Sequence, residues 1–179
     1  MAKAFGEAPT PEQILHYIYG VFYSNIYRST YAPLLKIDFP RVPFTADYDL
    51  FVRLGKLGKT LVELHLVKSP LLEKPIAKFQ GGGGNLVVQK IHYKAQTQKL
   101  FINNDKYFEG ISKELWEYQI GGYKVLQKYL KDRKGRVLDD PIHYCRIATS
   151  LFHTIAIQKE IDELYVQVEK QLIDFEKGD

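Results

Sequence analysis

The feature that most constrains the fold of this chain is a change in hydrophobic spacing along its length. Apolar residues recur three or four positions apart between residues 10 and 66, alternate with polar ones after the glycine run 81–84, and return to helical spacing after Asp140. The first and last patterns are typical of amphipathic helices, and the middle one of half-buried strands. The sequence therefore predicts an α+β fold in which helices flank a small antiparallel β-hairpin or sheet.

Capping residues place the first helices. Thr10 is followed by Pro11 and then by Gln13, which is the signature of a capping box with proline at the first helical position. A second short helix is expected from Asn25 to Lys36, and the two prolines in residues 39–43 predict an extended stretch. Thr45 is expected to open a third helix, one face of which is apolar and consists of Leu50, Leu54, Leu57, Leu61 and Leu64. The helix also contains Gly55 and Gly58, and such small residues suggest close packing against a neighbouring element.

The middle of the chain is expected to be built from short strands. A loop is predicted over residues 69–85, followed by a strand over 86–93 and its antiparallel partner over 99–103. A third short strand at Tyr107–Phe108 is also expected. The sequence then predicts a helical turn around Leu115–Trp116, and a basic amphipathic helix from Tyr123 to about Lys131.

A long helix is predicted at the end of the chain. Asp140 is a capping residue and Pro141 a first-position proline, and the apolar spacing continues to about Phe175. Such a helix of about 35 residues would be about 50 Å long, and its distal half is expected to pair with another helix. The near-heptad seam consists of Ile161, Leu164, Val168, Leu172 and Phe175.

No internal repeat and no second domain is evident in the sequence, so we expect a single domain over residues 1–179. Its expected parts are a helical region over 10–66, a β-hairpin region over 86–111, short helices with a basic stripe over 112–136, and a long helix over 140–176.

Charge is distributed unevenly along the sequence. The formal net charge is +4, but the stretch from Lys159 to the end holds three Lys against seven Asp or Glu, so residues 1–158 carry +8. A basic body with an acidic tail fits a polyanionic partner. A mildly basic domain without such a partner remains the alternative on charge alone.

Composition restricts the cellular setting. No stretch approaches the roughly 20 apolar residues that span a membrane, and the first residues lack the apolar core of a signal peptide. Cys145 is the only cysteine, which excludes an internal disulfide and fits a reducing cytoplasm. A cytoplasmic protein without a membrane partner is therefore expected.

Motifs for catalysis or cofactor binding are weak. Residues 55–60 end like a phosphate-binding P-loop, but Arg53 stands where that pattern needs its first glycine. The run 81–84 does not satisfy a dinucleotide-binding fingerprint and is better explained as a flexible linker. The five histidines form no metal-binding motif, and Cys145 is expected to be a small buried apolar residue. We therefore expect no catalytic site, no metal and no cofactor in this chain.

Two segments are candidates for nucleic-acid contact. The first is a basic stripe on and beyond the helix at 123–131, which could follow a phosphate backbone or could be a solvated helix face with cations at its C-terminus. The second is the polar hairpin at 90–106, whose amides and lysines suit base edges but would also be polar simply because a hairpin tip is exposed. The stripe comprises Tyr123, Lys124, Lys128, Lys131, Arg133, Lys134 and Arg136, and the hairpin offers Lys94, Gln96, Gln98, Lys99, Asn103, Asn104 and Lys106.

An ordered series of segments resembles the C-terminal specificity domain of Type ISP restriction–modification enzymes, which are single-chain translocating DNA methyltransferase–nucleases. The similarity covers roughly residues 12–165. It is carried by segments 14–20, 27–28 with Tyr31, 35–44, 61–66, 107–111, 120–126 and 129–136, the last of which reads Tyr-Leu-Lys-Asp-Arg-Lys-Gly-Arg.

The resemblance implies a bacterial or archaeal protein that helps to choose a DNA target for an adenine-specific methyltransferase domain of the same polypeptide. Its implied partners are double-stranded DNA and that methyltransferase domain. The methyltransferase, helicase and nuclease motifs are absent from this sequence, so S-adenosylmethionine, ATP and Mg²⁺ are expected only in a full-length enzyme, of which this chain would be a piece or a relic. The alternative function is a helical interaction module that docks onto the methyltransferase domain without reading bases.

Overall fold

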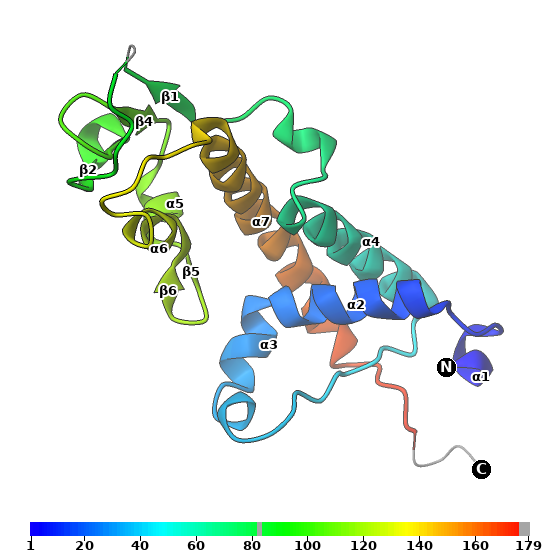
Figure 1. The fold of residues 1–179 in the computed structure, drawn as a ribbon. Coiled ribbons are helices and arrows are strands. Elements are labelled where there is room, and N and C mark those ends of the chain that lie inside the picture. Colours follow the sequence, from blue (N-terminus) through cyan, green and yellow to red (C-terminus); the bar gives the residue numbers. More distant parts are fainter. Residues whose placement is uncertain (82–83, 176–179) are drawn as a thin grey trace. The chain divides into compact units, whose positions relative to one another are not determined.

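The computed structural model describes residues 1–81 and 84–175 (Figure 1). Its contacts divide the chain into two compact units. Unit 1 combines Met1–Leu66 with Thr154–Asp179, and unit 2 comprises Val67–His153. The expectation of a single domain stays a prediction. Gly82 and Gly83, part of the expected linker, lie outside the described residues.

Unit 1 is helical. Its core is formed where α2, α4 and the C-terminal half of α7 bring their apolar faces together, and buried residues of all three helices meet there, among them Tyr17, Leu54 and Leu164. Its elements are α1 (Ala2–Phe5), α2 (Pro11–Tyr23), α3 (Asn25–Thr30), the 3-10 turn η1 (Leu34–Lys36), α4 (Tyr48–His65) and the distal part of α7 (Pro141–Val168).

The capping box predicted for the first long helix is confirmed. The Thr10 hydroxyl accepts the amide of Gln13 at 3.3 Å, and the Gln13 side chain accepts the amide of Thr10 at 2.7 Å. The following helix was predicted too long. α3 ends at Thr30, and a turn containing Pro33 separates it from η1, because proline has no amide with which to continue the helical hydrogen bonds.

Helix α4 begins two to three residues later than predicted. Asp47, not Thr45, is its N-cap, and its carboxylate accepts the amide of Leu50 at 3.0 Å. Thr45 is buried and extended instead, and its amide donates to the Tyr17 hydroxyl at 3.2 Å. Both residue types cap helices, so the choice between them depends on this tertiary hydrogen bond.

The small residues of α4 lie where α2 approaches it, as predicted. A Cβ atom at Gly58 would overlap the carbonyl oxygen of His16 and lie 2.9 Å from the amide nitrogen of Gly20. A Cβ at Gly20 would in turn lie 2.9 Å from the carbonyl oxygen of Leu54. The two backbones can approach this closely only because both positions lack a side chain.

The last helix ends earlier than predicted, at Val168 rather than near Phe175. The chain then turns back, and the amide of Ile173 donates to the carbonyl of Phe44 at 2.8 Å. Of the predicted seam, Ile161, Leu164 and Val168 are buried within unit 1, whereas Leu172 and Phe175 lie beyond the helix and are half exposed. Strand-like pairing with residues 44–46 replaces the last predicted turns.

Unit 2 contains a four-stranded antiparallel sheet in the order β1-β4-β3-β2. The register pairs Phe79 with Phe108, Phe108 with Leu100, and Leu100 with Tyr93. The buried Phe108 ring lies 4.4 Å from that of Tyr144 in α7, so the sheet packs on the first half of that helix. The strands are β1 (Lys78–Gln80), β2 (His92–Lys94), β3 (Lys99–Phe101) and β4 (Tyr107–Glu109).

Two strand predictions were inaccurate. The segment 69–85 is not only loop, because it holds a 3-10 turn η2 (Pro70–Leu72) and the edge strand β1. The strand predicted over 86–93 shortens to β2, which begins at His92 and continues past residue 93. Val87 and Val88 form isolated bridges to Val137 and Lys134 instead. The third strand at 107–108 is confirmed as β4.

The remaining elements of unit 2 follow the sheet. A hairpin of β5 (Gln119–Ile120) and β6 (Tyr123–Lys124) separates α5 (Lys113–Glu117) from α6 (Val125–Lys131), and a second 3-10 turn, η3 (Ala95–Thr97), joins β2 to β3. The β5–β6 hairpin was not predicted. The Asp140 carboxylate accepts the amide of His143 at 2.8 Å, which confirms the predicted start of α7.

The fold class is therefore α+β, as predicted. Among the described residues, no helix has the length and apolar character needed to cross a membrane.

Candidate nucleic-acid interface

Positive charge is concentrated in unit 2. Residues 67–153 hold fifteen Lys or Arg against eight Asp or Glu, a formal net charge of +7, whereas the remaining residues hold ten against thirteen, a net of −3. Unit 1 has the opposite sign because it includes the acidic C-terminal part of the chain. Both candidate segments belong to the basic unit.

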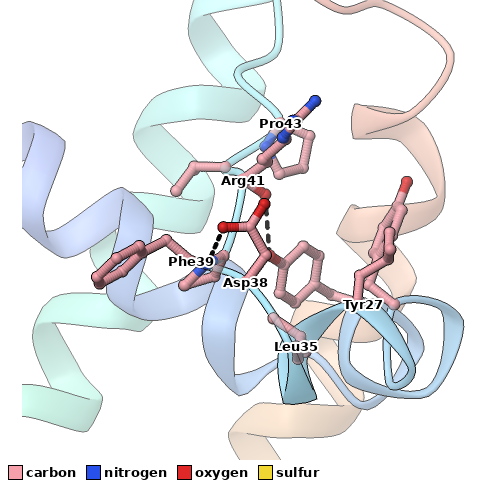
Figure 2. Close-up of a pocket in the computed structure, with 10 residues that line it drawn as sticks. Tyr27, Leu35, Asp38, Phe39, Arg41 and Pro43 are labelled. Carbon is pink, nitrogen blue, oxygen red and sulfur yellow. Dashed lines mark hydrogen bonds between the residues drawn. The ribbon is translucent and has the colours of Figure 1, made fainter.

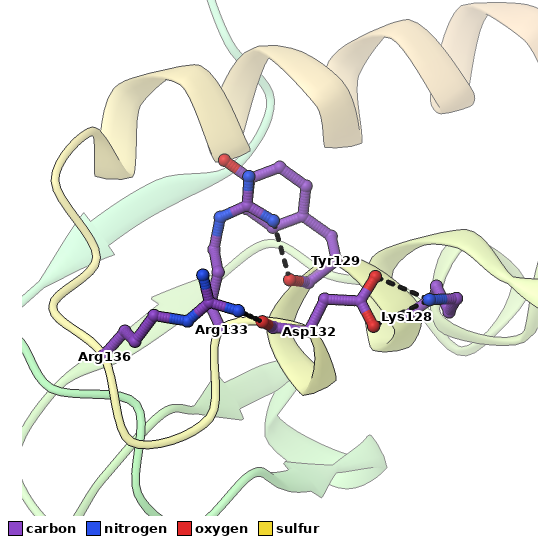
Figure 3. A network of polar contacts seen from close by, with 5 residues as sticks. All are labelled: Lys128, Tyr129, Asp132, Arg133 and Arg136. Atoms are coloured by element: carbon purple, nitrogen blue, oxygen red, sulfur yellow. Dashed lines mark hydrogen bonds and ion pairs between the residues drawn. The ribbon is translucent and has the colours of Figure 1, made fainter.

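The basic stripe begins at the end of β6 and runs along α6 into the turn that follows. Lys128, Lys131, Lys134 and Arg136 are exposed, Lys124 and Arg133 are partly buried, and Tyr123 is 62% exposed. The Lys128 ammonium donates to both carboxylate oxygens of Asp132, at 2.6 and 2.7 Å (Figure 3). One acidic side chain is thus built into the stripe and neutralises part of it.

Backbone carbonyls hold the two arginines of the stripe (Figure 3). Arg133 donates from Nη1 to the carbonyl oxygen of Tyr129 at 3.0 Å, and Arg136 donates from Nη2 to the carbonyl oxygen of Asp132. These carbonyls end α6, so the arginines satisfy acceptors that the helix leaves open and lie at the negative end of its dipole. This is the structural role that the sequence left as an alternative, and it leaves each guanidinium further donors for a ligand.

The hairpin presents its polar residues to different degrees. Gln96, Gln98 and Asn104 are exposed, and so is Lys94, whose ammonium lies 4.9 Å from the centroid of the Phe101 ring. Lys99 is partly buried, with its ammonium 4.5 Å from the centroid of the Tyr107 ring.

Two hairpin residues play structural parts. Lys106 is only 6% exposed, so its side chain does not lie on the accessible surface of the hairpin. Asn103 is also buried, and its side-chain oxygen accepts the amides of Asp105 and Lys106 at 3.0 and 2.8 Å. Asn103 therefore organises the turn between β3 and β4. Polarity in the sequence could not separate these two residues from their exposed neighbours.

A segment that the sequence predicted only as part of a strand, residues 86–90, joins the stripe to the hairpin. The amide of Val88 donates to the carbonyl of Arg136 at 3.0 Å, and the amide of Gly135 donates to the carbonyl of Val88 at 2.8 Å. On the other side, the amide of Gln89 donates to the carbonyl of Ile102 at 2.8 Å. The segment 86–90 thus fixes the basic turn to the sheet, and its exposed residues Gln89 and Lys90 extend the surface between the two candidates.

The remaining sequence motifs that could have indicated a cofactor, nucleophile or metal site lie in helices or in the core. Residues 55–60 lie within α4, which rules out a P-loop there. Cys145 is buried, as expected, and burial raises the pKa of its thiol to about 11. Within residues 1–81 and 84–175, no cluster of three or more His, Cys, Asp or Glu side chains could hold a metal ion.

His65 is part of a partly buried hydrogen-bonded network in unit 1. Its Nδ1 lies 2.8 Å from the Tyr19 hydroxyl, and its Nε2 lies 2.9 Å from the Thr154 hydroxyl. Burial lowers the pKa of this imidazole, so it is neutral near pH 7. The network ties α2, α4 and α7 together through side chains.

Unit 1 also has an apolar pocket of about 410 Å³ (Figure 2). Its wall is the extended segment that follows η1, held by a hydrogen bond of 2.9 Å from the Tyr27 hydroxyl to the carbonyl oxygen of Arg41. Phe39 borders the pocket and is 91% exposed, and the neighbouring Ile37 is 81% exposed.

The chain belongs to the family described as the Type ISP C-terminal specificity domain, whose profile matches residues 1–160. No curated protein matches the sequence significantly.

Three solved structures share the fold. The Type ISP restriction–modification enzyme LlaBIII bound to DNA aligns with a TM-score of 0.63 and 20% identity over 86% of this chain, and a nuclease-deletion mutant of the Type ISP enzyme LlaGI with a DNA substrate mimic aligns with 0.61 and 21% over 88%. The DrdV–DNA complex aligns with 0.67 and 19% over 90%. The aligned region makes up 11%, 16% and 19% of those chains, respectively, so this chain spans a small part of their length.

Proposed function

We propose that this chain is a DNA target-recognition module of a restriction–modification adenine methyltransferase. The single observation that carries the proposal is the concentration of positive charge in unit 2, where both candidate segments are joined by the backbone of residues 86–90. Membership of the specificity-domain family and the DNA in the three related structures support the same function.

The basic stripe supplies affinity. Its exposed cations, Lys131, Lys134 and Arg136, contact phosphates, release condensed counterions and set the register of the unit on the duplex. Arg133 and Arg136 enter this contact already held by backbone carbonyls, so little side-chain freedom remains to be lost on binding. Lys128 contributes less, because Asp132 already pairs with it.

The hairpin supplies sequence information. Exposed amide side chains at Gln96, Gln98 and Asn104 can each form two hydrogen bonds with adenine in the major groove. Lys94 can reach a guanine edge or a phosphate. Lys106 is not part of this readout, because its side chain is buried.

The chain itself performs no catalytic step in the proposed function. Methyl transfer, translocation and cleavage belong to other domains of a longer cytoplasmic, bacterial polypeptide, and those domains bind S-adenosylmethionine, ATP and Mg²⁺. This module presents the DNA target to the methyltransferase domain.

The test compares two triple variants that remove the same charge from different units. Lys131→Gln/Lys134→Gln/Arg136→Gln removes three of the six cations of the stripe, and Arg53→Gln/Lys56→Gln/Lys59→Gln removes three exposed cations of α4 in unit 1. Fluorescence anisotropy with a labelled mixed-sequence duplex at low salt measures the affinity. We expect the stripe variant to bind at least about 30-fold more weakly and the α4 variant to retain most of its affinity. Equal losses in the two variants would refute a specific role for the stripe.

A second function is favoured by the exposed apolar side chains of unit 1. Ile161, Leu164 and Val168 of the predicted seam are buried within this unit and cannot contact another domain. Docking onto the methyltransferase domain therefore needs another surface. We propose that Ile37 and Phe39, beside the 410 Å³ pocket, form that surface. Calorimetric titration of the methyltransferase domain tests it. Ile37→Ser/Phe39→Ser should abolish association without changing DNA affinity, and unchanged association would exclude this surface.

A further inference from the structure

The β5–β6 hairpin is a tight turn with an apolar tip. Its two turn residues, Gly121 and Gly122, both have positive φ, 57° and 83°, as a two-residue turn of the I′ type requires. Ile120 and Tyr123 flank this turn directly and are paired across the strands, so their side chains lie on the same face.

The base of the hairpin is anchored in unit 2. Trp116 of α5 is nearly buried and stacks on Tyr93 of β2, with ring centroids 5.3 Å apart. The amide of Val125 donates to the carbonyl of Tyr118 at 3.2 Å, and this hydrogen bond closes the base of the hairpin where α6 begins. The tip is thus held by packed elements on both sides.

The tip itself does not pack into the core. Ile120 is 37% exposed and Tyr123 is 62% exposed, and a Cβ atom at either glycine would meet no atom within 4 Å. Such an arrangement leaves a partly exposed aliphatic side chain beside a largely exposed aromatic one, and burying both further would be favourable.

Cations border this apolar pair. The Lys128 ammonium, which also pairs with Asp132, lies 5.9 Å from the centroid of the Tyr123 ring. Lys124 follows Tyr123 directly, on the opposite face of β6. Lys131 is one helical turn beyond Lys128 along α6. An apolar tip beside a row of cations matches a base step flanked by phosphates better than an apolar protein surface, which would leave those cations desolvated.

We propose that the tip of the β5–β6 hairpin acts as a wedge that enters a base step of duplex DNA. Ile120 and Tyr123 contact the faces of the bases that separate, while Lys124 and Lys131 pair with phosphates. The proposal rests on the proposed function and adds to it that the module deforms the DNA. Recognition then depends on how easily the base step at the wedge unstacks.

The experiment compares two duplexes that differ only in a central abasic site, where a wedge has less stacking to disrupt. Fluorescence anisotropy measures the affinity of the 179-residue chain for both. The wild-type chain should bind the abasic duplex about tenfold more tightly than the intact one, because the abasic site removes part of the stacking that the wedge must disrupt. Ile120→Ser/Tyr123→Ser should lose that preference.

The control variant is Ile142→Ser/Phe152→Ser, which changes an exposed isoleucine and an exposed aromatic residue on α7 of the same unit. It should keep the preference. A wild-type chain that binds both duplexes equally, or a wedge variant that keeps the preference, overturns the wedge while leaving DNA binding intact. A chain that binds neither duplex at low salt overturns the proposed function as well.

Discussion

The guanidinium of Arg133 lies over the ring of Tyr129, with its Cζ atom 3.5 Å from the ring centroid. The same side chain donates to the carbonyl oxygen of Tyr129 at 3.0 Å, and the Tyr129 ring packs 5.3 Å from that of buried Tyr144. Stacking and hydrogen bonding together fix the plane of the guanidinium. Lysine offers neither the planar stack nor the fork of donors, so charge alone does not reproduce this arrangement.

The Arg133 arrangement predicts different results for two substitutions. Arg133→Gln removes a charge and should lower the slope of log Kobs against log salt by about one in magnitude. Arg133→Lys keeps the charge and should keep the slope, but it should weaken binding about threefold or more at every salt concentration. Anisotropy titrations measure both quantities. Arg146→Lys, on exposed α7 surface, is the control and should bind like wild type. A wild-type slope for Arg133→Gln would show that Arg133 does not contact phosphate.

The contact between α2 and α4 predicts opposite effects at two glycines of one helix. In Gly58→Ala, the new methyl group overlaps the His16 carbonyl, so the free energy of unfolding should fall by about 3 kcal/mol. In Gly55→Ala, the nearest atoms are 3.8 Å and 3.9 Å away, so alanine should be tolerated and should add up to about 1 kcal/mol through helix propensity. Urea denaturation measures both. Equal effects would mean that the helices do not meet at Gly58.

Burial of His65 predicts a pH-dependent stability. Its pKa is lowered in the folded chain, so below about pH 6.5 the unfolded chain binds the proton more readily and the free energy of unfolding falls. Above that pH the imidazole is neutral in both states and the stability is fully present. Denaturant melts between pH 7.5 and 5.5 should show the loss, and His65→Gln should reduce it. His92→Gln, at an exposed strand residue, should leave the loss as in wild type. If His65→Gln lost as much stability between pH 7.5 and 5.5 as the wild type, another titratable group would be responsible for the loss.

The turn of the β2–β3 hairpin predicts that a substitution at Gln98 raises stability and weakens DNA binding. This residue has a φ of 51°, a left-handed conformation that costs a residue with a side chain about 1 kcal/mol. Gln98→Gly should therefore raise the free energy of unfolding by about 0.5–1 kcal/mol and remove one candidate base contact. Gln96→Gly, in the neighbouring 3-10 turn, should lower stability. Thermal melts and binding selections from random duplexes measure the two effects. If Gln98→Gly lowered the free energy of unfolding, the backbone at residue 98 would not be strained as argued.

Local signals in the sequence predicted helix starts better than helix ends. The Thr10 and Asp140 caps are read from three or four consecutive residues, and both form as predicted. The end of α7 was wrong because Leu172 and Phe175 continue its apolar spacing, while pairing of residues 171–173 with 44–46 decides the actual end. That pairing joins segments more than 120 residues apart, and helical periodicity does not contain it.

Strands were harder to predict for the same reason. β1 pairs with β4, about thirty residues later, and its three residues are too few for their polar–apolar alternation to distinguish a strand from a loop. The run at 86–93 has the composition of a strand, but Val88 bonds with the turn after α6 rather than with a neighbouring strand. Strand preference depends on such partners more than on the residues themselves.

The candidate site was predictable as a set of residue types, but its arrangement was not. The cations at 124–136 and the amides at 96–104 follow from composition and spacing, and they stay predictions as DNA contacts. The burial of Lys106 and the role of segment 86–90 depend on tertiary packing. The apolar tip at Ile120 and Tyr123 could have been suspected from the Gly121–Gly122 pair, since two adjacent glycines between apolar residues favour a tight hairpin.

The most direct test of the central claim is the salt dependence of duplex binding by this chain. Fluorescence anisotropy with a mixed-sequence duplex, repeated from about 25 to 250 mM salt, gives the slope of log Kobs against log salt. Contacts from the exposed stripe and the hairpin lysines predict a slope of about −3 to −5, since each phosphate contact contributes about −0.9. A flat dependence, or no binding at the lowest salt, would contradict DNA recognition by this chain and would leave docking through unit 1 as its function.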